Sequence, residues 1–301
     1  MAVVAAIMAA MVGWAAGPVH AGGGPENVVL VVNELSDDSK EIANHYINRR
    51  DIPLKNVVYL PWRGSVEQCK VGQFREEILK PVLDQVNKRG LALQADYVVY
   101  SAGFPWRIDL RPDFPKIDFP KQLEPYASIT GATYLWESTG RKNPTIFSLD
   151  ANWYVPKSPA NNLVKCASLA GVKTQAFRGR YRWLKGGTPK IKAEGSRRYL
   201  ISTMLGVTSG RGNTVREVLA YLDGAVRADR TQPQGTFYFT INDDVRSGVR
   251  HACYQGVAAA LREEGADAQV LQGVAPKGVT DILGLTTGHR ECYLQPVGSK
   301  V

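Results

Sequence analysis

Residues 27–60 read NVVLVVNELSDDSKEIANHYINRRDIPLKNVVYL, and this stretch decides the fold class. Its apolar run VVLVV is typical of a strand that is buried on both faces of a sheet. Side-chain oxygens that can cap a helix follow at Ser36, Asp37 and Asp38, and Glu41 lies at capping-box spacing from Asp38. A second apolar run, NVVYL, closes the stretch, which therefore predicts a strand–helix–strand unit.

The same alternation continues along the chain. A helix is predicted over residues 74–88, with a kink or a late start at Pro81, and a strand over residues 96–102. After a break it resumes with predicted strands at 198–205, 235–241, 267–273 and 279–285 and predicted helices at 214–230 and 245–261. This order predicts an α/β fold: a mostly parallel sheet with helices on both faces, as in flavodoxin-like or caspase-like sandwiches.

A long segment interrupts the alternation at residues 104–190. It holds nine of the 17 prolines and four of the six tryptophans, without a long periodic stretch. A connection of this length is uncommon in a compact domain unless it has a function. We therefore predict a single α/β domain over residues 26–301, with residues 104–190 as an insertion that covers one end of the sheet.

The first 21 residues carry no charged side chain. An apolar stretch, a Gly-Pro break and small residues at the end are typical of a signal peptide cleaved after Ala21. The apolar stretch is shorter than a membrane span. We therefore expect an exported protein, periplasmic or extracellular.

The net charge of +9 is concentrated in residues 165–198, which hold ten Lys and Arg and one acid. Within them, arginines alternate with glycine and aromatic residues, a pattern suited to gripping anionic groups. The proposed anion-binding residues are Arg178, Arg180, Arg182 and Lys185. The partner would be an anionic glycan or a membrane surface; nucleic acid does not suit an exported chain. The alternative is a hairpin with solvated charges.

The stretch ISTMLGVTSGRGNTVREVLAYL (201–222) predicts a strand, a glycine-rich loop and a helix, an arrangement that holds a phosphate in many proteins. Arg211 stands where a Walker loop counted from Gly206 needs glycine, and Val215 stands where a dinucleotide fingerprint needs it. No nucleotide or other cofactor is therefore predicted. A helix N-terminus still favours an anion; alternatively, the glycines merely form a turn that Thr214 caps.

Polar residues follow several of the predicted strands. In an open parallel sheet, ligands bind beyond the carboxyl ends of the strands. If the sheet is parallel, these residues meet at one edge and form a ligand site. The candidate ligand-binding residues are Asn33, Glu34, Ser101, Ser209, Arg211, Asn213, Asn242, Asp243 and Asp244. The alternative is that each of them only caps a neighbouring helix.

No nucleophile motif is visible, since the chain has no Gly-x-Ser-x-Gly elbow. His289 and Cys292 lie three residues apart, a weak signal for a cysteine–histidine or metal site, and no metal is predicted. The four cysteines, Cys69, Cys166, Cys253 and Cys292, allow three complete pairings, among which the sequence does not choose. Buried free thiols are the other interpretation for some of them.

Residues 26–62, 96–109 and 197–222 resemble a family of exported bacterial proteins of unknown function. The resemblance spans residues 26–288 and implies no catalytic residue. It also implies that relatives continue beyond the point matching residues 281–288, so we expect this chain to be C-terminally truncated.

Two function classes follow. The first is a hydrolase-like enzyme with its site at the carboxyl ends of the strands. The second is a non-catalytic binding protein that grips an anionic partner through residues 165–198. The sequence determines neither a substrate nor an oligomeric state.

Overall fold

The computed structural model describes residues 23–119, 124–148, 150–154, 176–210, 212–229, 231, 234–289 and 292. The predicted signal peptide lies outside these residues. The chain divides into two compact units, of which the second holds the C-terminal part from residue 227 onward. Each unit is described by itself below.

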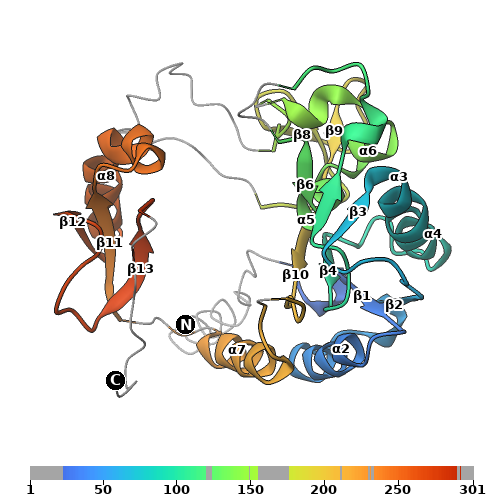
Figure 1. Ribbon diagram of the computed structural model, residues 1–301, viewed down its shortest axis with the longest axis horizontal. Helices are drawn as coiled ribbons and strands as arrows, with labels where there is room; N and C mark the ends of the chain where they lie inside the picture. Colours follow the sequence, from blue (N-terminus) through green and yellow to red (C-terminus); the bar gives the residue numbers. More distant parts are fainter. Residues whose placement is uncertain are drawn as a thin grey trace, which may run out of the picture. The chain divides into compact units, whose positions relative to one another are not determined.

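The first unit is built on a four-stranded parallel sheet in the order β10-β4-β1-β2 (Figure 1). Its strands are β1 (Val28–Asn33), β2 (Val57–Leu60), β4 (Tyr97–Tyr100) and β10 (Ile201–Met204). All four were predicted from their apolar runs. Strand β1 is central and buried on both faces, as its uninterrupted apolar sequence predicts.

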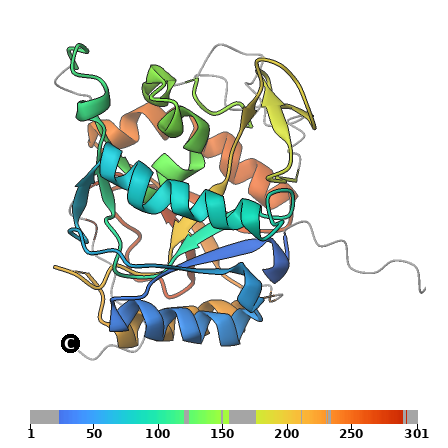
Figure 2. The same ribbon diagram turned by 90° about the vertical axis from the view of Figure 1, so that its right-hand side faces the viewer.

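Helices cover both faces of this sheet. Figure 2 shows α2 and α7 side by side on one face and the long α3–α4 helix on the other. Successive side chains of a strand point to opposite faces of the sheet, so alternate β1 residues pack against the helices on opposite sides. Val29 packs in the apolar cluster that contains Ile78, and Leu30 packs in the cluster that contains Ala43. The helices are α2 (Asp37–Arg50), α3 (Val71–Phe74), the π-helical η3 (Arg75–Leu79), α4 (Lys80–Lys88) and α7 (Val215–Ala228).

Two local predictions about these helices are settled. The capping residue of α2 is Ser36, whose Oγ accepts the N–H of Ser39 at 3.2 Å, rather than Asp38. The expected irregularity at Pro81 is the π-helical turn of η3 directly before α4. Proline has no N–H to donate, so a wider turn at this point relieves the helix of one regular hydrogen bond.

Two small sheets and two short helices occupy the segment between β2 and β10. The first sheet has the order β3-β5-β6, with β3 (Gln68–Lys70), β5 (Arg107–Asp109) and β6 (Tyr126–Ser128). The second has the order β8-β7-β9, with β7 (Arg182–Leu184), β8 (Thr188–Lys190) and β9 (Arg197–Arg198). The helices are α5 (Ile129–Tyr134) and α6 (Trp136–Gly140). Short 3₁₀ turns lie at Pro25–Asn27, Leu54–Asn56, Arg111–Asp113 and Pro144–Phe147. Strands β7 and β8 pair antiparallel, which is the hairpin that the sequence left open as the alternative interpretation of the basic segment.

The second unit contains a three-stranded parallel sheet in the order β12-β11-β13 and one long helix. Its elements are β11 (Thr236–Ile241), α8 (Val245–Glu263), β12 (Asp267–Gln272) and β13 (Ile282–Thr286). Phe239 packs against Tyr254 and Ala258 of α8, which gives this unit a core of its own.

The sequence predicted one sheet, and the described strands form two main parallel sheets instead. Strand β11 is the central strand of the second sheet, because it is hydrogen-bonded to β12 along one edge and to β13 along the other. No described helix is both long and apolar enough to cross a bilayer.

Candidate functional site

A small cavity lies where the sequence predicted a site, beyond the carboxyl ends of the first unit's strands. This rim cavity has a volume of about 220 Å³. Its lining residues lie at the end of β10 or follow β1, β2, β4 and β10: Ser36, Asp38, Val66, Gly103, Phe104, Met204, Gly206, Val207, Thr208 and Ser209. They offer hydroxyl groups and one carboxylate. Of the predicted ligand residues, Ser209 lines this cavity.

Two other predicted residues, Asn33 and Ser101, hold the ends of the strands in place. The Nδ2 of Asn33 donates to the carbonyl of Gly103 at 2.8 Å, and its Oδ1 accepts the N–H of Leu35 at 3.1 Å. The hydroxyl of Ser101 donates to the carbonyl of Ser39 at 2.7 Å. Both side chains are buried and satisfied, so they position the start of α2 beside the end of β4. Glu34, the neighbour of Asn33, is exposed.

The glycine loop between β10 and α7 closes on itself. The N–H of Asn213 donates to the carbonyl of Val207 at 2.8 Å, and that of Gly212 to the carbonyl of Ser209 at 2.9 Å. Thr214 caps α7 as part of a capping box: Glu217 accepts the N–H of Thr214 at 2.7 Å. The Glu217 carboxylate thus occupies a position at which a helix N-terminus would favour an anion. Arg211 lies outside the described residues.

The remaining predicted ligand residues belong to the second unit and its own sheet. Asn242 reaches Thr287 with its Nδ2 at 3.5 Å, and Asp243 lies 3.6 Å from the Nε2 of His289. The N–H of Asp244 donates to the Oδ1 of Asn242 at 3.1 Å. These residues gather at the carboxyl end of β11, as the order of the elements predicts, but around the sheet β12-β11-β13.

The arginine-rich segment is packed into the first unit through Asp96. This carboxylate is buried at the amino end of β4, accepts the N–H of Gly179 at 2.6 Å and lies 3.6 Å from the guanidinium of Arg178. Burial raises the pKa of Asp96, while Gly179 and Arg178 act to lower it. A Cβ at Gly179 would lie 2.2 Å from the carbonyl oxygen of Ala95, so this close approach requires glycine.

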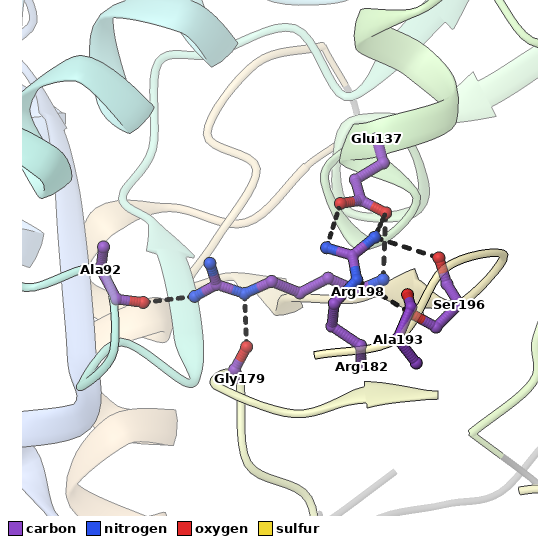
Figure 3. A network of polar contacts seen from close by, with 7 residues as sticks. All are labelled: Ala92, Glu137, Gly179, Arg182, Ala193, Ser196 and Arg198. Atoms are coloured by element: carbon purple, nitrogen blue, oxygen red, sulfur yellow. Dashed lines mark hydrogen bonds and ion pairs between the residues drawn. The ribbon is translucent and has the colours of Figure 1, made fainter. Parts of the chain in front are cut away.

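Glu137 of α6 contacts two further arginines, Arg182 and Arg198 (Figure 3). Its carboxylate accepts the Nη1 and Nη2 of Arg182 at 2.8 and 3.1 Å and the backbone N–H of Arg198 at 3.1 Å. The guanidinium of Arg182 also donates to the hydroxyl of Ser196 at 2.9 Å. Arg198 extends away from this cluster, and its guanidinium donates to the carbonyls of Gly179 and Ala92. Burial lowers the pKa of Arg198, and Glu137 acts against this shift.

The predicted anion-binding residues therefore divide into two pairs. Arg178 and Arg182 are bonded within the fold. Arg180 and Lys185 are exposed; the Arg180 guanidinium lies 5.3 Å from the ring of Tyr181, and the Nζ of Lys185 lies 3.2 Å from Asp150.

A second, larger cavity opens over this arginine cluster. This polar cavity has a volume of about 520 Å³. Its charged lining residues are Arg141, Arg182, Arg197, Arg198, Glu137 and Glu194, and its aromatic ones are Trp153 and Tyr199. Arg197 lies 3.9 Å above the Trp153 ring and donates to the carbonyls of Asp150 and Ala151. Arg141 is exposed at the end of α6, and no described side chain pairs with it.

An apolar cavity of about 420 Å³ adjoins the polar cavity. Its apolar lining comes from η3, α4, α6, β4 and the residues before β4 and β10: Leu79, Leu83, Val86, Ala92, Ala95, Val98, Trp136 and Leu200. The two cavities share Glu137, Arg141 and Arg198.

The sequence pointed to residues 165–198 but missed the partners that complete the polar cavity. Glu137, Arg141 and Trp153 come from the segment that showed no periodicity, where nothing in the spacing links them to Arg197. The usable signal was the concentration of arginine and tryptophan itself.

The cysteines and metal ligands add no further site among the described residues. Cys253 is disulfide-bonded, while Cys69 and Cys292 are free thiols; Cys166 lies outside the described residues. Burial raises the pKa of Cys69 to about 12, which disfavours the thiolate form that reacts as a nucleophile. In the described part of the chain, no group of three His, Cys, Asp or Glu residues could hold a metal ion.

Comparisons with protein-family models, with curated proteins and with solved structures found no match for this chain.

Proposed function

We propose that this protein binds an anionic ligand, an acidic sugar of a glycan, in the polar cavity. One observation carries the proposal: for three of the four arginines that line this cavity, no carboxylate accepts from the guanidinium group among the described contacts. Arg197 and Arg198 bond to backbone carbonyls, and Arg141 is exposed without a side-chain partner. An arginine fork matches the geometry of a carboxylate or sulfate, so an acidic group complements this surplus of positive charge.

The shape and remaining lining of the cavity support a sugar. Its volume of about 520 Å³ lies within the ordinary range of small-molecule sites. Ser138, Asn143 and Thr145 add neutral hydroxyl and amide groups to the lining, which suit sugar hydroxyls. The ring of Trp153 is already stacked under Arg197, which fixes that guanidinium in the cavity wall.

A hydrolase with its site at the rim cavity is the second proposal, supported by the position of that cavity beyond the carboxyl ends of a parallel sheet. The chemistry there favours binding over hydrolysis. Ser36 uses its Oγ to cap α2, and the described contacts give Ser209 no base within hydrogen-bond reach.

We also propose that the first unit is a flavodoxin-like sandwich with residues 104–190 as an insertion between β4 and β10. The strand order β10-β4-β1-β2 supports this proposal, because it corresponds to order 2-1-3-4 when the four strands are numbered along the chain. Export through a signal peptide at residues 1–21 remains a proposal from the sequence, and it would place the protein where glycans are abundant.

Calorimetric titration with methyl glucuronide, and with methyl glucoside as its neutral counterpart, tests the function. We expect the glucuronide to bind more tightly, and added salt to weaken it. Arg141→Gln should weaken glucuronide binding by roughly tenfold or more, since it removes a hydrogen bond to a charged group.

The matched control is Arg63→Gln, which removes an exposed arginine that lines neither cavity. Equal affinity for glucuronide and glucoside, or equal losses in Arg141→Gln and Arg63→Gln, would contradict the proposal.

A further inference from the structure

The apolar cavity points to a more specific ligand than an acidic sugar alone. Its lining combines the apolar side chains of Leu79, Leu83 and Trp136 with guanidinium groups at its border. Such a pocket excludes water from one part of a ligand and holds a charge at another. An apolar lining is best satisfied by an apolar group, because burial of hydrocarbon is favourable.

The two cavities meet at the last turn of α6 and at Arg198. Glu137 and Arg141 are four residues apart at α6 and its end, and both line both cavities. The backbone N–H of Arg198 donates to the Glu137 carboxylate, and its guanidinium donates to the carbonyl of Ala92, a residue that lines the apolar cavity (Figure 3). Its side chain therefore forms the boundary between the polar and the apolar space, and a ligand beside it touches both.

The charges at this boundary favour a negative group. The carboxylate of Glu137 is bonded to Arg182, and that of Glu76 lies 3.8 Å from Lys80. Asp84 is exposed on α4. Arg141 and Arg198 remain at the border, and no carboxylate accepts from either guanidinium in the described contacts.

We propose that the ligand is an acidic sugar carrying an acyl or alkyl chain, with the sugar acid in the polar cavity and the chain in the apolar cavity. This inference rests on the proposed function and names the class of its ligand. The acid lies against Arg141, beside Arg198, and the chain lies against Leu83 and Leu79 between α4 and α6.

The experiment compares four probes by calorimetry, each below its critical micelle concentration: methyl glucuronide, octyl glucuronide, methyl glucoside and octyl glucoside. Each methylene that becomes buried should tighten binding roughly fourfold. Burial of three to four methylenes would make octyl glucuronide about a hundredfold tighter than methyl glucuronide. Octyl glucoside should bind less tightly than octyl glucuronide, since it lacks the acid.

Substitutions in the apolar cavity test the binding of the octyl chain separately from that of the sugar acid. Leu83→Asp puts a carboxylate in the apolar wall, and Leu83→Trp fills the cavity without adding charge. Both should abolish most of the gain in affinity of octyl glucuronide over methyl glucuronide, and Leu83→Trp shows that the loss does not depend on added charge. Leu93→Asp is the matched control, because Leu93 is 73% exposed and lines neither cavity. Thermal unfolding of each variant verifies the fold.

The outcomes distinguish the two proposals. Equal affinity for methyl and octyl glucuronide, with both tighter than the glucosides, overturns this inference and supports the proposed function. Binding of octyl glucoside as tight as that of octyl glucuronide overturns both proposals. Loss of the octyl gain in both Leu83 variants, but not in Leu93→Asp, supports the placement of the chain.

Discussion

Glu137 shows how much one carboxylate arranges at the scale of single residues. It is bidentate to Arg182, it holds the backbone of β9 through the N–H of Arg198, and its side chain is 14% exposed. Planar pairing of this kind fixes direction as well as distance, so it sets the orientation of the Arg182 guanidinium in the polar cavity wall.

Glu137→Gln keeps the shape of the side chain and removes its charge. Arg182 then stays mostly buried without a counter-charge, which should lower the free energy of unfolding by about 2 kcal/mol. Urea denaturation of the two proteins measures the difference. The control is Glu124→Gln, because Glu124 pairs with Arg107 at 3.2 Å but is 76% exposed. That change should cost less than about 1 kcal/mol. Equal costs would contradict the prediction, because the Glu137 pair would then add no more stability than an exposed pair.

At the scale of elements, the loop between β10 and α7 depends on glycine for its close backbone contacts. A Cβ at Gly212 would lie 2.0 Å from the carbonyl oxygen of Val207, which accepts the N–H of Asn213. Gly210 has a φ of +61°, in the region that disfavours side chains. The loop is therefore a compact turn rather than an open cradle.

Gly212→Ala forces this turn to open and should lower the free energy of unfolding by roughly 1–3 kcal/mol. The control is Gly72→Ala in α3, where a new Cβ meets nothing within 4 Å. That substitution should be neutral or slightly stabilising, because alanine favours a helix. Chemical denaturation compares them. A harmless Gly212→Ala would show that the loop relaxes freely.

Elements with a local signal were predictable from the sequence. The apolar run of β1 and the Thr214–Glu217 capping box depend on neighbours in the chain, and both are present. Sheet membership is a non-local property: nothing in the sequence of β11 says that β12 and β13 occupy its two edges.

Side-chain pairing across the fold was equally hidden. The charge run at 165–198 predicted a surface, but Arg182 finds Glu137 across 45 residues of sequence. Spacing along the chain carries no information about such a contact. The composition of the candidate site was predictable from the sequence. Which of its arginines form ion pairs within the fold was not predictable.

At the scale of the whole molecule, two separate cores predict two unfolding events. The first unit packs around residues such as Val98 of β4, and the second around Phe239 of β11. Chains with more than one compact unit often depart from two-state behaviour. Thermal unfolding of residues 22–301, followed by circular dichroism and calorimetry, should therefore show two transitions.

Core substitutions assign those transitions. Val98→Ala should lower the midpoint of one by several degrees, and Phe239→Leu should lower that of the other. If both substitutions shift a single shared transition, the two units unfold together and the prediction fails.

A parallel sheet has a direction, and the first unit places a different chemistry at each end of it. The rim cavity, with its hydroxyl groups and a carboxylate, lies beyond the carboxyl ends of β4 and β10. The guanidinium-lined cavities lie near their amino ends, beside Ala95 and Leu200. The four-residue strands between these cavities span roughly 13 Å. The rim cavity shares no lining residue with either of the guanidinium-lined cavities. Selection can therefore reshape either end without disturbing the other, and one domain can carry two unrelated specificities.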